Sequence, residues 1–218
     1  RGFCGWWPDS TITVQPVLAD LQTLVCNWRN PGLIDLSQVS RLTKLYCEDK
    51  QLTRLNLSQV PQLTELYCGG NHLTVLDLFS VPRLTKLYCA GNQLTELRLS
   101  LVPRLTELDC RGNPLSDIDL SSVPELTKLS YWCNPPINVD LSMIPRLIEL
   151  YCQDNQLNKL NLSHVTEVTK LVCSRNSLSV LDLSPVAGLK ALECNSNKLT
   201  KLDLPLPKLT ELACWDNE

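Results

Sequence analysis

Residues 84–104 read LTKLYCAGNQLTELRLSLVPR, and close copies of this stretch fill most of the 218-residue chain. The copies share a consensus of 21 positions, L-x-x-L-x-C-x-x-N-x-L-T-x-L-D-L-S-x-V-P-x, numbered here from the opening leucine, so that Leu84 is position 1 and Cys89 is position 6. Ten cysteines mark the register: Cys4, Cys26, Cys47, Cys68, Cys89, Cys110, Cys152, Cys173, Cys194 and Cys214. A period of roughly 20 to 29 residues indicates a solenoid, in which each copy forms one coil.

The order of apolar residues within each copy predicts how a coil is built. Positions 4 and 6 alternate with polar neighbours, so leucine and cysteine point inward from a short strand. Positions 14 to 16 alternate as well and form an extended return segment, which the proline at position 20 ends. A copy this short leaves little room for a helix on the outer side. We therefore predict an α/β-type solenoid that is mostly β, a right-handed coil with a parallel concave sheet of about ten to eleven short strands and extended or 3₁₀ segments on the convex side.

The motif resembles the leucine-rich repeat, and this resemblance covers the whole chain. Copies of the form L-x-x-L-x-C-x-x-N-x-L-T-x-L-D resemble those of internalin J and related bacterial surface proteins, whose repeats carry a cysteine ladder. Residues 84–97 match that pattern, whereas Arg98 and Val102-Pro103 depart from it. Near the end, Leu204-Pro205-Leu206-Pro207 resembles the L-P-x-L-P repeats of IpaH-type and YopM-type bacterial effectors.

The repeats predict a single leucine-rich-repeat domain over residues 1–218. Residues 1–20 form a partial first repeat, 21–208 hold nine repeats, and 209–218 form a truncated last one. Neither end carries an evident capping repeat, and no signal peptide is visible, so we expect the domain to come from a longer protein.

The cysteine column is predicted to consist of free, buried thiols. Side chains at one position of adjacent parallel strands point the same way, which does not readily give the torsion of a disulfide. Zinc is disfavoured because no C-x-x-C pair exists. The column breaks once, where Tyr131 takes the cysteine position, Cys133 is displaced, and Pro135 and Pro136 follow. We expect a bulge or kink in the sheet there. The recurrent asparagine at position 9 is predicted to satisfy backbone groups where each strand leaves the sheet.

Function is predicted to lie on the outward positions of the sheet. Position 3 alternates between lysine and glutamate over seven copies, which favours pairing between neighbouring strands. Aromatic residues gather at positions 5, 7 and 8, and tyrosine and tryptophan often anchor protein interfaces. Tyr46, Tyr67 and Tyr88 are also expected to stack on one another. The predicted partner-binding residues are Tyr46, Tyr67, Tyr88, Asp109, Arg111, Ser130, Trp132, Tyr151 and Trp28, with the centre of the site around Trp132. Repeat drift without a role is the alternative for the Trp132 copy.

Catalysis is not predicted. His72 and His164 lie outside the sheet positions, and no nucleophile, base or phosphate-binding loop can be placed in one pocket, so neither metal nor cofactor is expected. A net charge of −3 gives no general affinity for nucleic acid, and no apolar run is long enough to insert in a membrane. We predict a monomeric protein-binding module exported from a bacterium to its surface or surroundings, with a host protein as a candidate partner. Substrate recognition for an effector enzyme such as an IpaH-type ubiquitin ligase, and glycan binding, are the alternatives. Free thiols would also suit a reducing cytoplasm.

Overall fold

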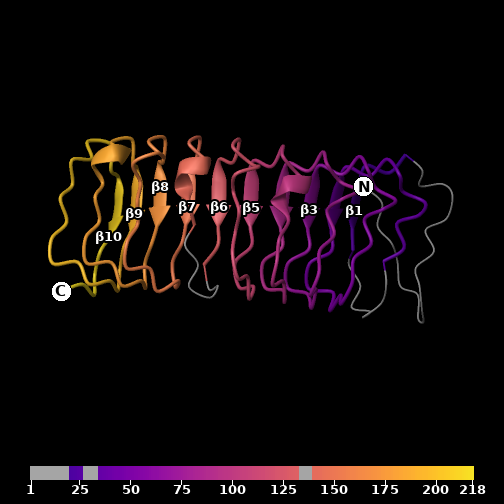
Figure 1. Cartoon of the computed structure of the whole chain (residues 1–218), viewed down its shortest axis with the longest axis horizontal. Helices are drawn as coiled ribbons and strands as arrows, with labels where there is room; N and C mark the ends of the chain where they lie inside the picture. The colour runs from indigo at the N-terminus through magenta and orange to yellow at the C-terminus, as the bar shows by residue number, and fades with distance from the viewer. Residues whose placement is uncertain (1–19, 27–33, 133–138) are drawn as a thin grey trace.

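The chain forms a parallel β-solenoid with one long sheet. The structure is a computed structural model that describes residues 20–26, 34–132 and 139–218. Ten strands pair in chain order, with every pair parallel (Figure 1). The strands are β1 (Thr23–Val25), β2 (Lys44–Tyr46), β3 (Glu65–Tyr67), β4 (Lys86–Tyr88), β5 (Glu107–Asp109), β6 (Lys128–Ser130), β7 (Glu149–Tyr151), β8 (Lys170–Val172), β9 (Ala191–Glu193) and β10 (Glu211–Ala213). The predicted strand number and arrangement are confirmed.

Each strand is only three residues long, and β1 to β9 bury their central leucine, whereas Leu212 of β10 is exposed. In β3, Leu66 is fully buried, whereas Glu65 and Tyr67 are half-buried on the opposite face. The register sets like positions side by side, so that Leu45 pairs with Leu66 and Leu66 with Leu87. The apolar side chains of successive coils therefore merge into one continuous core, which is how a repeat that is unstable alone becomes stable in an array.

The cysteine column lies in this core, directly after the strands. Eight cysteines from Cys26 to Cys194 are buried and Cys214 is exposed, and those from Cys47 to Cys214 carry free thiols. The main chain extends the sheet past the last strand residue, since the amide of Cys47 donates to the carbonyl of Tyr67 over 2.8 Å. Burial raises the pKa of the Cys152 thiol to about 12. The prediction of free, buried thiols is confirmed from Cys47 to Cys194 and is wrong for Cys214, which is exposed in the last coil; Cys4 and Cys133 lie outside the described residues.

The position-9 asparagines hold the turns below the sheet. The Asn92 side-chain amide donates to the carbonyls of Cys68 and Cys89, each over 3.0 Å, and its oxygen accepts the amide of Leu73 over 3.0 Å. One side chain thus satisfies groups from two successive coils. The neighbouring position 8 has positive φ in every described copy from Asp49 onward, which favours the glycines at three of them, such as Gly91 at φ 61°.

A second ladder, which was not predicted from the sequence, lies at position 2, directly before the strands. The hydroxyl of Thr64 donates to the carbonyl of Thr43 over 3.0 Å, and Thr85 donates to Thr64 in the same way. The series continues through Thr106 and Thr127. Each hydroxyl ties one coil to the preceding one at the point where the chain enters its strand.

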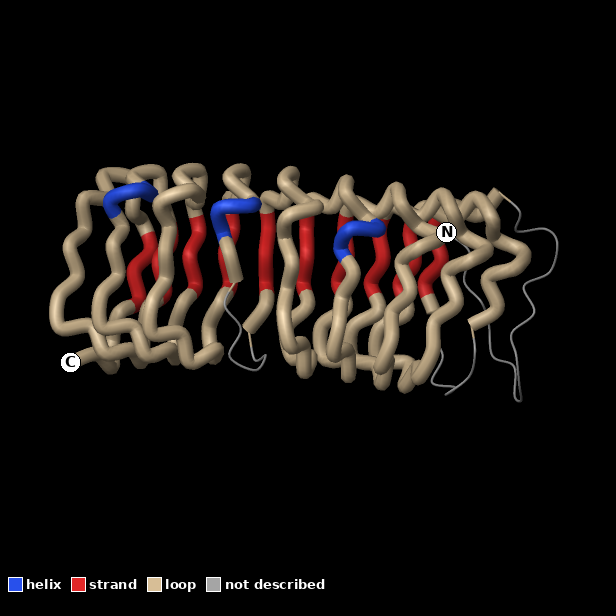
Figure 2. The backbone as a smooth tube through the Cα atoms, in the orientation of Figure 1, coloured by secondary structure: helices blue, strands red, loops and turns tan. Residues whose placement is uncertain are grey.

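The outer side is built from extended segments and short 3₁₀ helices, as predicted. The helices are η2 (Leu99–Leu101), η3 (Leu141–Met143) and η4 (Ser184–Val186), which lie on the side of the coil away from the strands (Figure 2). Side-chain oxygens at position 15 tighten the turns into this region, as where Asp140 accepts the amide of Ser142 over 3.0 Å. Among the described residues, no helix has the length and apolar character needed to cross a lipid bilayer.

The predicted bulge at Tyr131 is wrong within the described part of this copy. Strand β6 pairs in unbroken register with both β5 and β7, and the amide of Tyr131 still donates to the carbonyl of Tyr151 over 3.1 Å. The Tyr131 ring is buried in the cysteine column, with its hydroxyl bonded to the thiol of Cys152. The core therefore accepts the larger side chain without interrupting the sheet. Cys133, Pro135 and Pro136 lie outside the described residues.

Candidate functional site

The outward face of the sheet carries a stack of three tyrosines. The rings of Tyr46 and Tyr67 lie 4.4 Å apart between centroids, and those of Tyr67 and Tyr88 lie 4.7 Å apart, each pair nearly parallel at 10°. This spacing follows from the register, because all three occupy position 5 of neighbouring parallel strands. The predicted stacking is confirmed. The stack packs each ring against its neighbour, and all three side chains are half-buried.

Charged pairs lie beside the stack at position 3. The ammonium of Lys44 is 2.8 Å from the Glu65 carboxylate, Lys86 is 2.7 Å from Glu107, and Lys128 is 3.1 Å from Glu149. Each lysine thus pairs with the glutamate of the following strand. The hydrogen bond from Lys44 to Glu65, together with the attraction between their charges, raises the pKa of the lysine.

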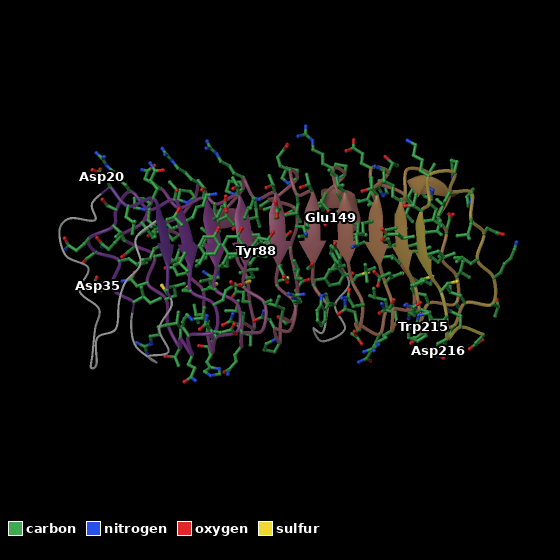
Figure 3. All side chains as sticks on the ribbon, turned by 180° about the vertical axis from the view of Figure 1, so that it is seen from behind. Asp20, Asp35, Tyr88, Glu149, Trp215 and Asp216 are labelled. Carbon is green, nitrogen blue, oxygen red and sulfur yellow. The ribbon has the colours of Figure 1, made fainter. Side chains whose placement is uncertain are left out.

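The tyrosine hydroxyls are tied into the same network. Tyr67 donates to Glu65 over 3.2 Å and Tyr151 to Glu149 over 3.1 Å, while Tyr88 donates to Glu107 on the next strand. Tyr88 and Glu149 lie along the strand side of the molecule (Figure 3). Burial raises the pKa of the Tyr151 hydroxyl, and its hydrogen bond to Glu149 adds to that effect.

A second group of side chains surrounds Trp132. The Asp109 carboxylate is 3.2 Å from Nε of Arg111, whose guanidinium lies 5.1 Å from the centre of the Trp132 ring. Arg111 is therefore held between a carboxylate and an aromatic face, both of which limit its motion. Burial raises the pKa of the Asp109 carboxyl, and the charge of Arg111 opposes this shift.

Tyr151 lies between two ammonium groups. The Nζ atoms of Lys128 and Lys170, which belong to the strands on either side of β7, are each 5.4 Å from the centre of its ring. Cations so placed are attracted by the negative face of an aromatic ring. These contacts were not predicted from the sequence, although positions 3 and 5 of the repeat lie on the same face of neighbouring strands.

The structure separates the predicted site residues into two groups. Tyr46, Tyr67 and Tyr88 form the stack on β2 to β4, whereas Arg111, Trp132 and Tyr151 lie on or just after β5 to β7. Between them, Asp109 and Ser130 are only 8% and 6% exposed, so they lie beneath their neighbours and not at the outermost surface. Trp28 lies outside the described residues. Trp215, 63% exposed, lies far from both groups, after the last strand (Figure 3).

The described part of the chain gives little support for a metal site or for a pocket beside the aromatic residues. No group of three or more His, Cys, Asp or Glu side chains among those residues could hold a metal ion. A groove of about 420 Å³ lies on the return segments, lined by Ser179–Ser184, Thr200, Lys201, Asp203 and Pro205, and so belongs to the side away from the aromatic residues. That catalysis is absent remains a prediction.

Comparison with known proteins agrees with the geometry. Family models for leucine-rich repeats match residues 61–101, as two copies, and 104–126. No curated protein sequence matches the chain significantly. Among solved structures, the functional domain of InlJ from Listeria monocytogenes, described as including a cysteine ladder, is 32% identical with a TM-score of 0.75, over 92% of this chain and 54% of that one.

Two further structures are similar at lower identity. InlF, an internalin from Listeria monocytogenes, is 21% identical with a TM-score of 0.75, over 86% of this chain and 59% of that chain. YopM from Yersinia enterocolitica is 25% identical with a TM-score of 0.69, over 92% and 43%. The chain thus spans about half the length of these structures. The repeat, the buried thiol column and these similarities together identify the chain as an internalin-like leucine-rich-repeat domain of the cysteine-ladder type.

Proposed function

We propose that this chain is a protein-binding module and that its partner docks on the outward face of the sheet. The observation that carries the proposal is the distribution of aromatic side chains. Of those the structure describes, only Tyr131 is buried in the core, whereas six lie on the sheet face or just below it: Tyr46, Tyr67, Tyr88, Trp132, Tyr151 and Trp215. Apart from Tyr131, leucine, valine, isoleucine and cysteine fill the interior. The rings on the sheet face are therefore available as interface anchors.

These side chains are held in place by their neighbours, and this further supports a role in binding. Stacking fixes Tyr67 between two other rings, and Asp109 fixes Arg111 over Trp132. A partner that contacts such side chains does not have to immobilise them, which removes part of the entropic cost of association. Arginine, tryptophan and tyrosine are also the residues most often found at the energetic centre of interfaces.

The length of the surface suits a folded protein. From β2 to β7 the sheet advances by five strand spacings, or about 24 Å at about 4.8 Å per strand. An interface of ordinary size extends over a comparable distance. We expect the partner to touch both the tyrosine stack and the Trp132 group.

The similarity to InlJ and InlF favours a bacterial protein that is exported to the cell surface or secreted, with a protein of a host as a candidate partner. The similarity to YopM keeps substrate recognition by a secreted effector as the second candidate. Both candidates place the partner on the same face, so one binding experiment addresses the site in either case.

The test is a selection of binders from a library of displayed protein domains, followed by affinity measurements on matched variants. Trp132→Ala with Tyr151→Ala removes two rings from the proposed site, and Phe79→Ala removes a ring that is 74% exposed on the outer side. Loss of two interface anchors predicts an affinity at least about 30-fold weaker, against less than about threefold for Phe79→Ala. Melting temperatures close to that of the parent chain would show that both variants fold. Binders that depend on Phe79 and tolerate the double substitution would refute the proposal, and selection of glycans alone on a parallel array would do so as well.

A further inference from the structure

The charged ladder at position 3 has one lysine left over. Its seven members alternate from Lys44 to Lys170, and the observed pairs join β2 with β3, β4 with β5, and β6 with β7. Lys170 on β8 is the seventh. Its register partner on the preceding strand, Glu149, is already paired with Lys128 at 3.1 Å. On the following strand, where each of the other three lysines finds a glutamate, the register partner is Ala191.

Lys170 therefore has no carboxylate of its own. Among the residues that the structure describes, none brings an acidic oxygen within 4 Å of its ammonium, which instead lies 5.4 Å from the centre of the Tyr151 ring. The methyl group of Ala191 occupies far less space than the glutamate side chain of the equivalent positions. Ala191 therefore leaves open the space above β9 that a glutamate side chain would occupy, while the ammonium of Lys170 lies toward the Tyr151 ring of β7.

The surroundings of this space suit an acidic side chain that is covered by a partner. Val172, buried at position 5 of β8, and the Tyr151 ring give it apolar walls. Two exposed carboxylates lie near, Glu193 two residues along β9 and Glu211 opposite Ala191 on β10, and Lys190 precedes Ala191 directly. With Lys170 these four charges sum to zero. Ala191 thus has Lys170 as its register partner on one side and Glu211 on the other.

We infer that the partner supplies the missing member of the ladder, a glutamate or aspartate side chain that enters the space above Ala191 and pairs with Lys170. This inference rests on the proposed function, since it needs a protein partner on this face. The geometry would repeat that of the other three pairs, in which the ammonium and carboxylate lie 2.7 to 3.1 Å apart. Exposed ion pairs contribute little, but a partner that excludes water from Tyr151 and Val172 would strengthen this one.

The chain itself offers a matched pair of variants. Ala191→Glu places the missing carboxylate within the molecule and completes the ladder, whereas Ala191→Gln adds a side chain of the same shape without the charge. In spectra of lysine-labelled protein, Ala191→Glu is expected to shift the ε-methylene and ammonium resonances of Lys170, and Ala191→Gln to leave them close to their parent positions. Resonances that respond equally to the two substitutions would show that Lys170 does not pair with a carboxylate at this place, and the inference would fall.

The second arm uses binders from the domain-display selection and from a random-peptide library. Those selected on the parent chain are expected to carry an Asp or Glu whose replacement by Asn or Gln weakens binding about tenfold. Ala191→Glu should weaken the binding of these binders by a similar factor, and Ala191→Gln should weaken it by less than about threefold. In a chain that carries Lys170→Gln, neither substitution should change the affinity further. Binders that require Trp132 but are indifferent to Ala191→Glu would overturn this inference and leave the proposed function standing. If binders ignore Trp132 and Tyr151, the proposed function falls, while the Lys170 resonances still report on the pairing chemistry.

Discussion

Replacement of Asn92 by alanine is the most direct test of how the coils are held together. Asn92 is 7% exposed and makes three good hydrogen bonds, donating to the carbonyls of Cys68 and Cys89 and accepting from the amide of Leu73. Alanine removes all three bonds and leaves the buried Leu73 amide without its acceptor, whereas the carbonyls of Cys68 and Cys89 still accept from the side chains of Asn71 and Asn113. The unsatisfied amide costs about 1–3 kcal/mol, and each of the two other lost bonds about 0.5–1.5 kcal/mol. We therefore expect the free energy of unfolding to fall by about 3–4 kcal/mol.

The measurement is urea unfolding followed by circular dichroism, with Asn56→Ala as the control. Asn56 is exposed, and its side chain accepts one amide, that of Ser58, over 3.0 Å. Loss of this single exposed bond should cost about 0.5–1 kcal/mol. A decrease for Asn92→Ala no larger than that for Asn56→Ala would show that the asparagine ladder does not stabilise the array, and the account of the turns given above would be wrong.

Three further predictions concern the column of thiols and the buried carboxylate. Cys89→Ser should lower the free energy of unfolding by about 1–3 kcal/mol, because it buries a hydroxyl, whereas the exposed Cys214→Ser should change it by less than about 0.5 kcal/mol, both measured by urea unfolding. Tyr131→Phe removes the hydroxyl bonded to Cys152 and should cost about 1 kcal/mol in the same assay, without loss of the native spectrum. Folding raises the pKa of Asp109, so the native state takes up a proton and stability falls as pH rises from the ordinary aspartate value through the raised one. The melting temperature of the Asp109→Asn variant should fall less over that pH interval than the melting temperature of the parent chain.

Each of these expectations has a clear contrary outcome. Equal effects of the two cysteine substitutions would mean that burial of the column does not matter. A Tyr131→Phe variant as stable as the parent would show that the hydrogen bond to Cys152 does not stabilise the fold. Parallel pH profiles of the parent and Asp109→Asn would show that this carboxyl titrates alike in the folded and unfolded chain.

The core and the strand register could be predicted from the sequence because the same constraint acts on every copy. A strand of three residues has one inward side chain, so Leu66 and the following Cys68 had to face the core, and the register then aligned Tyr67 with its neighbours. The stacked rings and the free thiols follow from that alignment alone. Periodicity carries this information, and no knowledge of individual contacts is needed.

The contacts between outward side chains could not be predicted in full, because the period of the repeat allows more than one arrangement. Alternating charges at position 3 allow each lysine to pair with the preceding or the following strand, and only side-chain geometry selects the following one, as in Lys86 with Glu107. The burial of Asp109 and Ser130 arises from longer side chains around them, which a single position in a repeat does not reveal. The threonine ladder was visible as a repeated letter, yet its bond to the preceding coil required the path of the backbone.

The copy with Tyr131 shows how a regular core and a variable surface are linked. In the flanking copies, position 6 is cysteine and position 7 is Arg111 or Gln153, whereas here both positions are aromatic. Tyr131 enters the core and Trp132, the next residue, lies under the guanidinium of Arg111. The unbroken pairing of β6 means that the buried phenol fixes the backbone from which the indole projects. An enlarged side chain inside the sheet thus supports an enlarged one outside it, and a substitution at Tyr131 that loosens the core should also weaken any partner that binds Trp132.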